Sequence, residues 1–134
     1  LAHRAAQQGK ALASALFGDG SVYYEERYVP SVSYTRPGLA RVGMTEKAAR
    51  SSGIRFEVKR SDFGSNILAR AELKGGGFFK ALYSEDRLIG AAVVCEGAAE
   101  LIAGMGLALA AGLGHSDLKK WIIAHPTLSE ILLP

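Results

Sequence analysis

Strand patterns gather in the middle of the chain. The sharpest is an alternation that places apolar side chains on one face and charged side chains on the other: Ile54, Phe56 and Val58 against Arg55, Glu57 and Lys59. This period of two predicts a strand with one buried face. Residues 29–34 predict a short strand that ends in a turn over residues 35–38. Residues 77–83 and 87–95 predict an antiparallel hairpin around Ser84-Glu85-Asp86.

Helical patterns lie mainly towards the two ends of the chain. The predicted helices are residues 1–17, ended by Gly18-Asp19-Gly20; residues 46–52, capped by Thr45; residues 98–111; and residues 117–123, capped by Ser116. Strands in the middle and helices after them favour an α+β fold, in which an antiparallel sheet carries helices packed on one face. Gly104-Met105-Gly106 lies inside an apolar helix, so we interpret it as a site of close helix packing and not as a dinucleotide motif.

The chain divides into three parts. Residues 1–17 form a helix with nothing before it to pack on, residues 18–28 are a linker, and residues 29–134 form the main domain. A length of 134 residues suits one compact domain. The chain begins at Leu1, without a Met and already inside a predicted helix, so we expect its N-terminus to have been cut from a longer protein.

Composition excludes several classes of function. The net charge is +3, but basic residues are interleaved with acidic ones, so nucleic acid is not an expected partner. The apolar run 101–113 is too short to cross a membrane. No signal peptide is visible, and we expect a cytoplasmic protein. Cys95 is the only cysteine, which excludes an internal disulfide, a CxxC motif and a thiolate zinc site.

The segment with the clearest chemical potential is residues 124–130. Pro126 should end one helix near His125, and a new helix should begin at Thr127. On a continuous helix His125 and Glu130 could not meet, but the break at Pro126 permits contact. A carboxylate bonded to one ring nitrogen selects the tautomer and leaves the other nitrogen free to exchange a proton. The pattern therefore predicts an acid/base dyad.

Other interpretations of these residues stay open. Thr127-x-x-Glu130 is also a capping box, in which Glu130 only satisfies backbone donors of its own helix. His125 alone could be a helix-terminal histidine favoured by the dipole. A zinc site built from His115, His125 and Glu130 matches no known spacing, so we expect no metal. His115 itself is expected to be solvated.

Three segments resemble the C-terminal interface domain of the pyridine nucleotide-disulfide oxidoreductases. Residues 1–5 (Leu1-Ala2-His3-Arg4-Ala5) are similar to the last helix of the family's FAD domain, and residues 30–46 are similar to the entry to its interface domain. His125-Pro126-Thr127-Leu128-Ser129-Glu130 is similar to its active-site signature, and it is the most specific of the three segments. The resemblance extends along nearly the whole chain.

The resemblance implies that residues of this chain act in the active site of the other subunit of a homodimer. His125 would be the acid/base and Glu130 its orienting partner, acting in the active site of the other subunit of a homodimer beside a cysteine pair. FAD and NAD would be the cofactors of the full-length enzyme, with Leu1, Ala2, His125 and Pro126 near the flavin and a cis peptide before Pro126. The FAD and NAD domains would lie earlier in the same chain, so this piece alone would bind no cofactor and be inactive.

The leucine at position 128 is similar to the dihydrolipoamide dehydrogenase branch of the family. That branch implies oxidation of dihydrolipoamide and a 2-oxo acid dehydrogenase complex as a partner. Gly38 and Ile123 depart from the family's usual glutamate and second histidine. The alternative function is a free-standing, non-catalytic dimerisation or binding module, in which Glu130 is only a cap.

Overall fold

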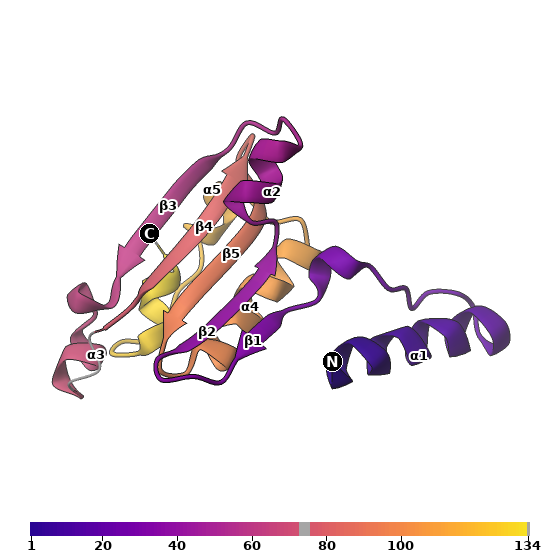
Figure 1. Cartoon of the computed structure of the whole chain (residues 1–134), viewed down its shortest axis with the longest axis horizontal. Coiled ribbons are helices and arrows are strands. Elements are labelled where there is room, and N and C mark those ends of the chain that lie inside the picture. The colour runs from indigo at the N-terminus through magenta and orange to yellow at the C-terminus, as the bar shows by residue number, and fades with distance from the viewer. Residues whose placement is uncertain (73–75, 134) are drawn as a thin grey trace.

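The computed structural model describes residues 1–72 and 76–133. Its centre is an antiparallel sheet of five strands in the order β1-β2-β5-β4-β3 (Figure 1). The strands are β1 (Ser31–Ser33), β2 (Gly38–Gly43), β3 (Glu57–Asp62), β4 (Phe78–Ser84) and β5 (Arg87–Cys95). The two longest strands, β4 and β5, pair as a hairpin in the interior of the sheet. The predicted α+β class with an antiparallel sheet is confirmed.

Helices pack mainly on one face of this sheet, behind it in Figure 1. The longest of these, α4 (Ala98–Ala110), crosses β2 and β5. The short helix α5 (His115–Leu118) and the 3₁₀ helix η3 (Leu128–Leu132) lie on the same side. The remaining helices are α1 (Ala2–Phe17), η1 (Glu26–Tyr28), α2 (Glu46–Ser51), η2 (Phe63–Ser65) and α3 (Ile67–Ala71). None of the described helices has both the length and the apolar character needed to cross a bilayer.

The core lies between the sheet and α4. Val42, Phe79 and Val93 from the strands and Ile102 and Met105 from the helix are at most 1% exposed. Each large apolar side chain buried in this way stabilises the fold by about 1.5–3 kcal/mol. Leu118 of α5 and Ile131 and Leu132 of η3 belong to the same core, which positions α5 and the segment that carries the predicted dyad.

Helix α1 is outside this core. It begins and ends where the sequence predicted and contains no buried residue. Figure 1 shows it beyond the β1 edge of the sheet, joined by the segment that contains η1. His3 Nε2 donates to the carbonyl oxygen of Pro30 at 2.9 Å, and Arg4 pairs with Glu26 at 3.0 Å, so a few polar contacts hold α1 to the segment that follows it.

Several elements match the prediction because local signals define them. Thr45 Oγ1 accepts the backbone N–H of Ala48 at 3.1 Å and caps α2. The hairpin turns at Glu85 and Asp86, which both adopt positive φ (48° and 70°). This conformation is the one that tight two-residue hairpin turns require. Helix α4 also lies where it was expected.

The strand predictions needed correction. The predicted strand 29–34 contains only the three residues of β1, and β2 was missed because Pro37-Gly38 was interpreted as a turn alone. The alternation at Ile54, Phe56 and Val58 was placed too early, since β3 begins at Glu57. Its predicted buried face was wrong as well: β3 is an edge strand, and Val58 is 41% exposed.

Apart from α4, the helices after residue 60 also differ from the prediction. Helix α3 and the 3₁₀ helix η2 were not expected. Helix α5 begins two residues before the predicted start and ends at Leu118, so residues 119–124 are not helical. Ser116 does not cap it; the backbone N–H of Gly114 donates to Asp117 Oδ2 at 3.1 Å instead. The early end leaves residues 119–127 as an irregular approach to η3.

Candidate functional site

The segment that carries His125 is held against α4 before it reaches the histidine. Gly104 of α4 has no side chain, and a Cβ built there would lie 3.2 Å from the ring of Trp121. The glycine therefore allows Trp121 to approach the helix closely, which agrees with the packing interpretation of Gly104-Met105-Gly106. After Trp121 the chain runs through a cis peptide bond between His125 and Pro126 and enters η3.

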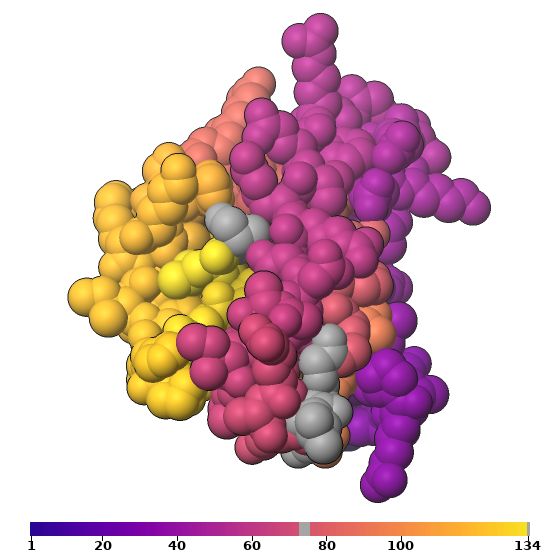
Figure 2. Space-filling view, turned by 90° about the vertical axis from the view of Figure 1, so that its left-hand side faces the viewer, coloured from indigo at the N-terminus to yellow at the C-terminus, as the bar shows by residue number. Residues whose placement is uncertain are grey.

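The C-terminal end of this segment is anchored in the core. Ile131 and Leu132 of η3 are 4% and 2% exposed, and Leu128 and Leu133 pack against the same cluster. Figure 2 shows this part of the chain, in yellow, seated between the magenta β3–α3 region and the orange α4–α5 region. Contacts of η3 with α4, β3 and β4 agree with that view. A rigid 3₁₀ turn therefore presents Glu130.

His125 and Glu130 meet. Nδ1 of the imidazole lies 2.9 Å from Oε1 of the carboxylate. The histidine side chain is 60% exposed and the glutamate side chain is 32% exposed, so the pair lies at the surface with its imidazole outward. The contact bridges the break at Pro126, as the sequence predicted. A carboxylate in this place accepts a hydrogen bond from Nδ1–H and leaves Nε2 as an acceptor.

The capping interpretation of Glu130 also describes a real contact. The second carboxylate oxygen, Oε2, accepts the backbone N–H of Thr127 at 2.9 Å. Glu130 thus uses one oxygen for the backbone and the other for the imidazole, and the two interpretations are compatible. The Thr127 N–H and then the His125 contact lower the pKa of Glu130 below its ordinary value. The carboxylate is therefore ionised near neutral pH.

Thr127 connects this pair to the rest of the domain. Its hydroxyl donates to the carbonyl oxygen of Ala124 at 2.8 Å, which ties together the two sides of the proline break. Its own carbonyl oxygen accepts a hydrogen bond from Asn66 Nδ2 at 2.9 Å. The sequence analysis missed Asn66. An asparagine followed by a short apolar run is a helix-cap signal, but nothing in the sequence links it to a residue 61 positions later.

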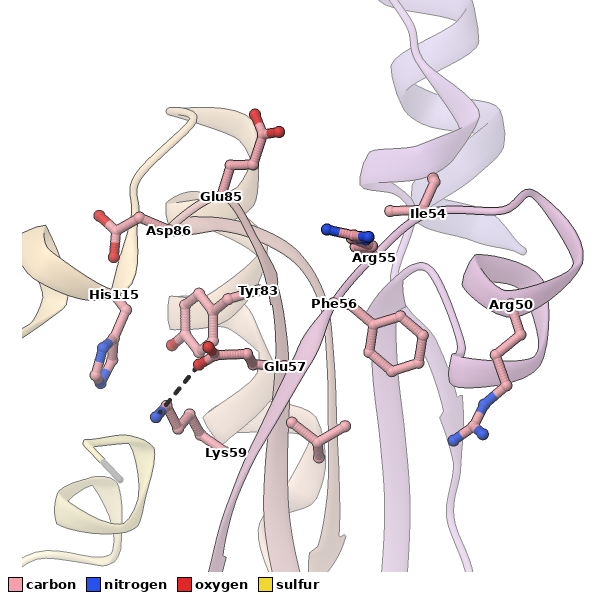
Figure 3. A pocket seen from close by; sticks show the side chains of 11 residues that line it. Arg50, Ile54, Arg55, Phe56, Glu57, Lys59, Tyr83, Glu85, Asp86 and His115 are labelled. Carbon is pink, nitrogen blue, oxygen red and sulfur yellow. Dashed lines mark ion pairs between the residues drawn. The ribbon is translucent and has the colours of Figure 1, made fainter.

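His115 does not lie where the sequence predicted. It was expected in solvent, yet its Nε2 is buried and finds no hydrogen-bond partner within residues 1–72 and 76–133; the same holds for the hydroxyl of Tyr83. The two rings lie 5.1 Å apart between their centroids. Figure 3 shows them in a depression of about 880 Å³ beside Glu57 and Lys59, which form an ion pair at 3.5 Å.

A metal site is not formed by these residues. His115 lies in the depression on β3, away from the pair formed by His125 and Glu130. In the described part of the chain, no three His, Cys, Asp or Glu side chains come together as metal ligands. The charged side chains that line the depression are three basic and three acidic residues: Arg50, Arg55, Lys59, Glu57, Glu85 and Asp86.

The other predicted site residues are spread over the molecule. Leu1 is 68% exposed, and Ala2 and Pro126 are exposed too.

Cys95 is a buried free thiol at the end of β5, and burial raises its pKa to about 11. A thiol of this kind is not a nucleophile at neutral pH, because the thiolate is the reactive form.

Large apolar side chains are exposed on α4 and in the segment just before His125. Ile122, three residues before it, is 94% exposed, and Trp121 is 39% exposed. Leu107, on the side of α4 that faces away from the sheet, is 73% exposed. Most large apolar side chains of α4 point into the core, so Leu107 marks a second apolar surface of the same helix. Exposed apolar groups of this size are typical of a surface that another molecule covers.

Comparison with known families and proteins gives a consistent result. Residues 29–133 match the family described as pyridine nucleotide-disulphide oxidoreductase, dimerisation domain. The chain is 40% identical over 133 residues to a dihydrolipoyl dehydrogenase of Trypanosoma brucei brucei and 36% identical over 137 residues to one of Staphylococcus aureus. These matches cover 97% and 99% of this chain but 27% and 29% of the relatives.

Solved structures show the same relationship. The chain superposes on the crystal structure of LpdA from Mycobacterium tuberculosis with a TM-score of 0.89 and 27% identity, over 99% of this chain and 29% of that one. It superposes on the flavoprotein disulfide reductase RclA from Escherichia coli with a TM-score of 0.80 and 31% identity, over 90% of this chain and 28% of that one. The chain thus spans a little over a quarter of the proteins that it resembles.

Proposed function

The chain belongs to the pyridine nucleotide-disulphide oxidoreductase family as its dimerisation domain, and from this premise we propose that it supplies His125 and Glu130 as an acid/base pair to the active site of a partner subunit. The full-length protein is proposed to be a dihydrolipoyl dehydrogenase, which oxidises dihydrolipoamide with NAD through FAD and a cysteine pair. The similarity to dihydrolipoyl dehydrogenases along 97–99% of this chain supports the choice of that branch.

The observation that carries the proposal is the contact between His125 Nδ1 and Glu130 Oε1. With the Nδ1 proton bonded to the carboxylate, Nε2 is free to take a proton from a thiol and to return it. The imidazolium that forms is stabilised by Glu130, whose lowered pKa keeps it charged. An imidazole 60% exposed is accessible to a group carried by another subunit.

The thiols of the proposed reaction lie outside residues 1–134, and we propose that the partner subunit supplies them. The only cysteine is buried, and its raised pKa disfavours the thiolate. The proton acceptor and the thiols must therefore come from different parts of the assembly. Ile122, three residues before His125, and Leu107 of α4 are exposed apolar side chains, and homodimers bury side chains of this kind. We propose that this surface forms part of the dimer contact.

The residues proposed to lie near FAD are exposed at the surface, so they would cover the cofactor and would not enclose it. FAD, when bound, would pass electrons between the cysteine pair and NAD. Leu1, Ala2, His125 and Pro126 are exposed and can cover such a group. Leu1 and Ala2 lie beyond the β1 edge of the sheet, whereas η3 contacts β3 at the other edge (Figure 1). Residues at these two edges of one chain could not easily contact the same flavin. We therefore propose that Leu1 and Ala2 lie near the flavin of their own subunit, and that His125 and Pro126 lie near the flavin of the partner subunit.

Further parts of the proposal concern the full-length protein. Its FAD and NAD domains are the expected neighbours of α1, whose surface has no buried residue in this chain. A 2-oxo acid dehydrogenase complex and a cytoplasmic location belong to the same proposal. The present chain alone is expected to be inactive and to bind neither cofactor.

The proposal is tested with His125→Gln in the full-length enzyme, measured as steady-state oxidation of dihydrolipoamide. Loss of general acid/base catalysis predicts a fall in kcat of about 10²- to 10⁴-fold with the dimer retained. Unchanged turnover in His125→Gln would favour the alternative, a non-catalytic dimerisation or binding module in which Glu130 only satisfies the Thr127 N–H.

A further inference from the structure

The core contains a polar side chain that the proposed chemistry does not yet use. Asn66 is 7% exposed and is the buried polar side chain among the residues that the structure describes. Placing an amide in an apolar core is unfavourable unless its groups are hydrogen bonded. Asn66 meets this condition with two contacts, one from each end of its amide, and the two contacts serve different parts of the fold.

The carbonyl end of the amide serves a local purpose. Oδ1 accepts the backbone N–H of Ala69 at 2.9 Å and caps α3. The backbone of Asn66 is fixed as well, because its N–H donates to the carbonyl of Phe63 and its carbonyl accepts from Arg70. The residue is therefore held by η2 on one side and by α3 on the other. Its side chain has a defined direction before it reaches any distant partner.

The amino end of the amide serves a distant purpose. Nδ2 donates to the carbonyl oxygen of Thr127 at 2.9 Å. The N–H of the same residue donates to Glu130 Oε2, and the other oxygen of Glu130 contacts His125. The peptide of Thr127 is thus clamped between Asn66 and Glu130. A continuous chain of hydrogen bonds runs from the buried amide to the exposed imidazole.

We propose that Asn66 is a positioning residue for the pair of His125 and Glu130. The proposal rests on the proposed function of that pair. Asn66 touches no reacting group; it sets the place of the Thr127 peptide, and the Thr127 peptide sets the direction of the Glu130 carboxylate. An asparagine suits this place better than an aspartate, because only the amide can cap α3 with an oxygen and also donate to the Thr127 carbonyl.

The test separates the two ends of the amide. Asn66→Asp keeps the cap acceptor but removes the donor and directs a carboxylate at the Thr127 carbonyl. Asn66→Ser is uncharged, keeps a hydroxyl for the cap and is too short to reach Thr127. The control is Thr45→Ala, which removes the corresponding cap of α2 at Ala48. All variants are made in the full-length enzyme and compared by unfolding temperature, kcat, KM and the pH–rate profile.

We expect both Asn66 variants to lower kcat by about tenfold or more with little change in KM, as a small displacement of a catalytic group does. Their pH–rate profiles should move, because the imidazole loses its fixed carboxylate. Thr45→Ala should lower the unfolding temperature and leave kcat and the profile unchanged. If Asn66→Asp does not fold, Asn66→Ser decides. Normal kcat and profile in the Asn66 variants, or equal losses in Thr45→Ala, would overturn the proposal.

His125→Gln separates this inference from the function on which it rests. If His125→Gln loses turnover and the Asn66 variants do not, the acid/base role stands and the positioning role fails. If His125→Gln keeps its turnover, the acid/base role itself fails.

Discussion

Glu130 holds His125 with one carboxylate oxygen and its own helix start with the other. The 2.9 Å contact from Oε1 to the imidazole Nδ1 and the 2.9 Å contact from the Thr127 N–H to Oε2 exist together. The capping box and the proposed acid/base dyad are therefore compatible uses of one side chain. The hydrogen bond from the Thr127 N–H orients the Glu130 carboxylate so that its other oxygen contacts the imidazole of His125.

Glu130→Gln tests how much of the chemistry depends on the charge. The substitution preserves the length of the side chain but removes the charge that stabilises an imidazolium. We expect kcat for dihydrolipoamide oxidation to fall roughly tenfold or more. Glu130→Ala should lose more, because it also leaves the Thr127 N–H without its acceptor. Equal kcat in wild type and Glu130→Gln would show that the carboxylate acts only as a cap.

The lowered pKa of Glu130 predicts how stability changes in acid. A carboxyl group with a lower pKa in the folded protein stabilises the fold fully above its ordinary value of 4.5 and loses that contribution as the pH falls through the folded value. Wild type should therefore lose more stability than Glu130→Gln when the pH is lowered from about 6 to about 3. Thermal unfolding at several pH values measures the difference, and parallel curves would contradict the assignment.

Leu107→Asp tests the proposed dimer surface. A charge at a side chain that is 73% exposed should cost little in a folded monomer but should oppose burial against a partner. Sedimentation of the full-length enzyme is expected to show dissociation or a much weaker dimer. The matched control is Tyr34→Asp, since Tyr34 is 87% exposed on another part of the surface. A dimer as stable as wild type in Leu107→Asp would exclude this surface.

Gly90→Ala tests the close approach of β5 to the end of β2. A Cβ at Gly90 would lie 2.0 Å from the carbonyl oxygen of Met44, which is backbone and cannot turn away. We expect a loss of about 1–3 kcal/mol in the free energy of unfolding, as for other overpacked sites. Gly64→Ala is the control, because a Cβ there meets nothing within 4 Å. Denaturant unfolding of both variants gives the comparison.

Local signals explain which elements could be predicted. Thr45 predicts the start of α2, and the polar pair Glu85-Asp86 between two apolar runs predicts the hairpin. Strand β2 was missed because its ends are glycines, Gly38 and Gly43, which resemble turn residues when their pairing with β5 is unknown. The start of β3 was misplaced because an edge strand buries little, so its apolar residues do not mark the strand.

The candidate site could be predicted in part for a similar reason. Pro126 indicates a break in the chain before residue 127, and that break is enough to predict contact between His125 and Glu130. The hydrogen bond from Asn66 to Thr127 depends on how η3 docks beside α3, which no local pattern contains. The partial burial of His115 was missed for the same reason, since it depends on the approach of Tyr83 from β4.

The central claim is that His125 serves the thiols of the other subunit, and a hybrid dimer tests it most directly. One full-length subunit carries His125→Gln, and the other carries serines in place of its cysteine pair. Each homodimer should be inactive. If His125 acts across the interface, the purified hybrid contains one complete site, and its activity should approach half that of wild type. A hybrid as inactive as the two parent homodimers would contradict the account.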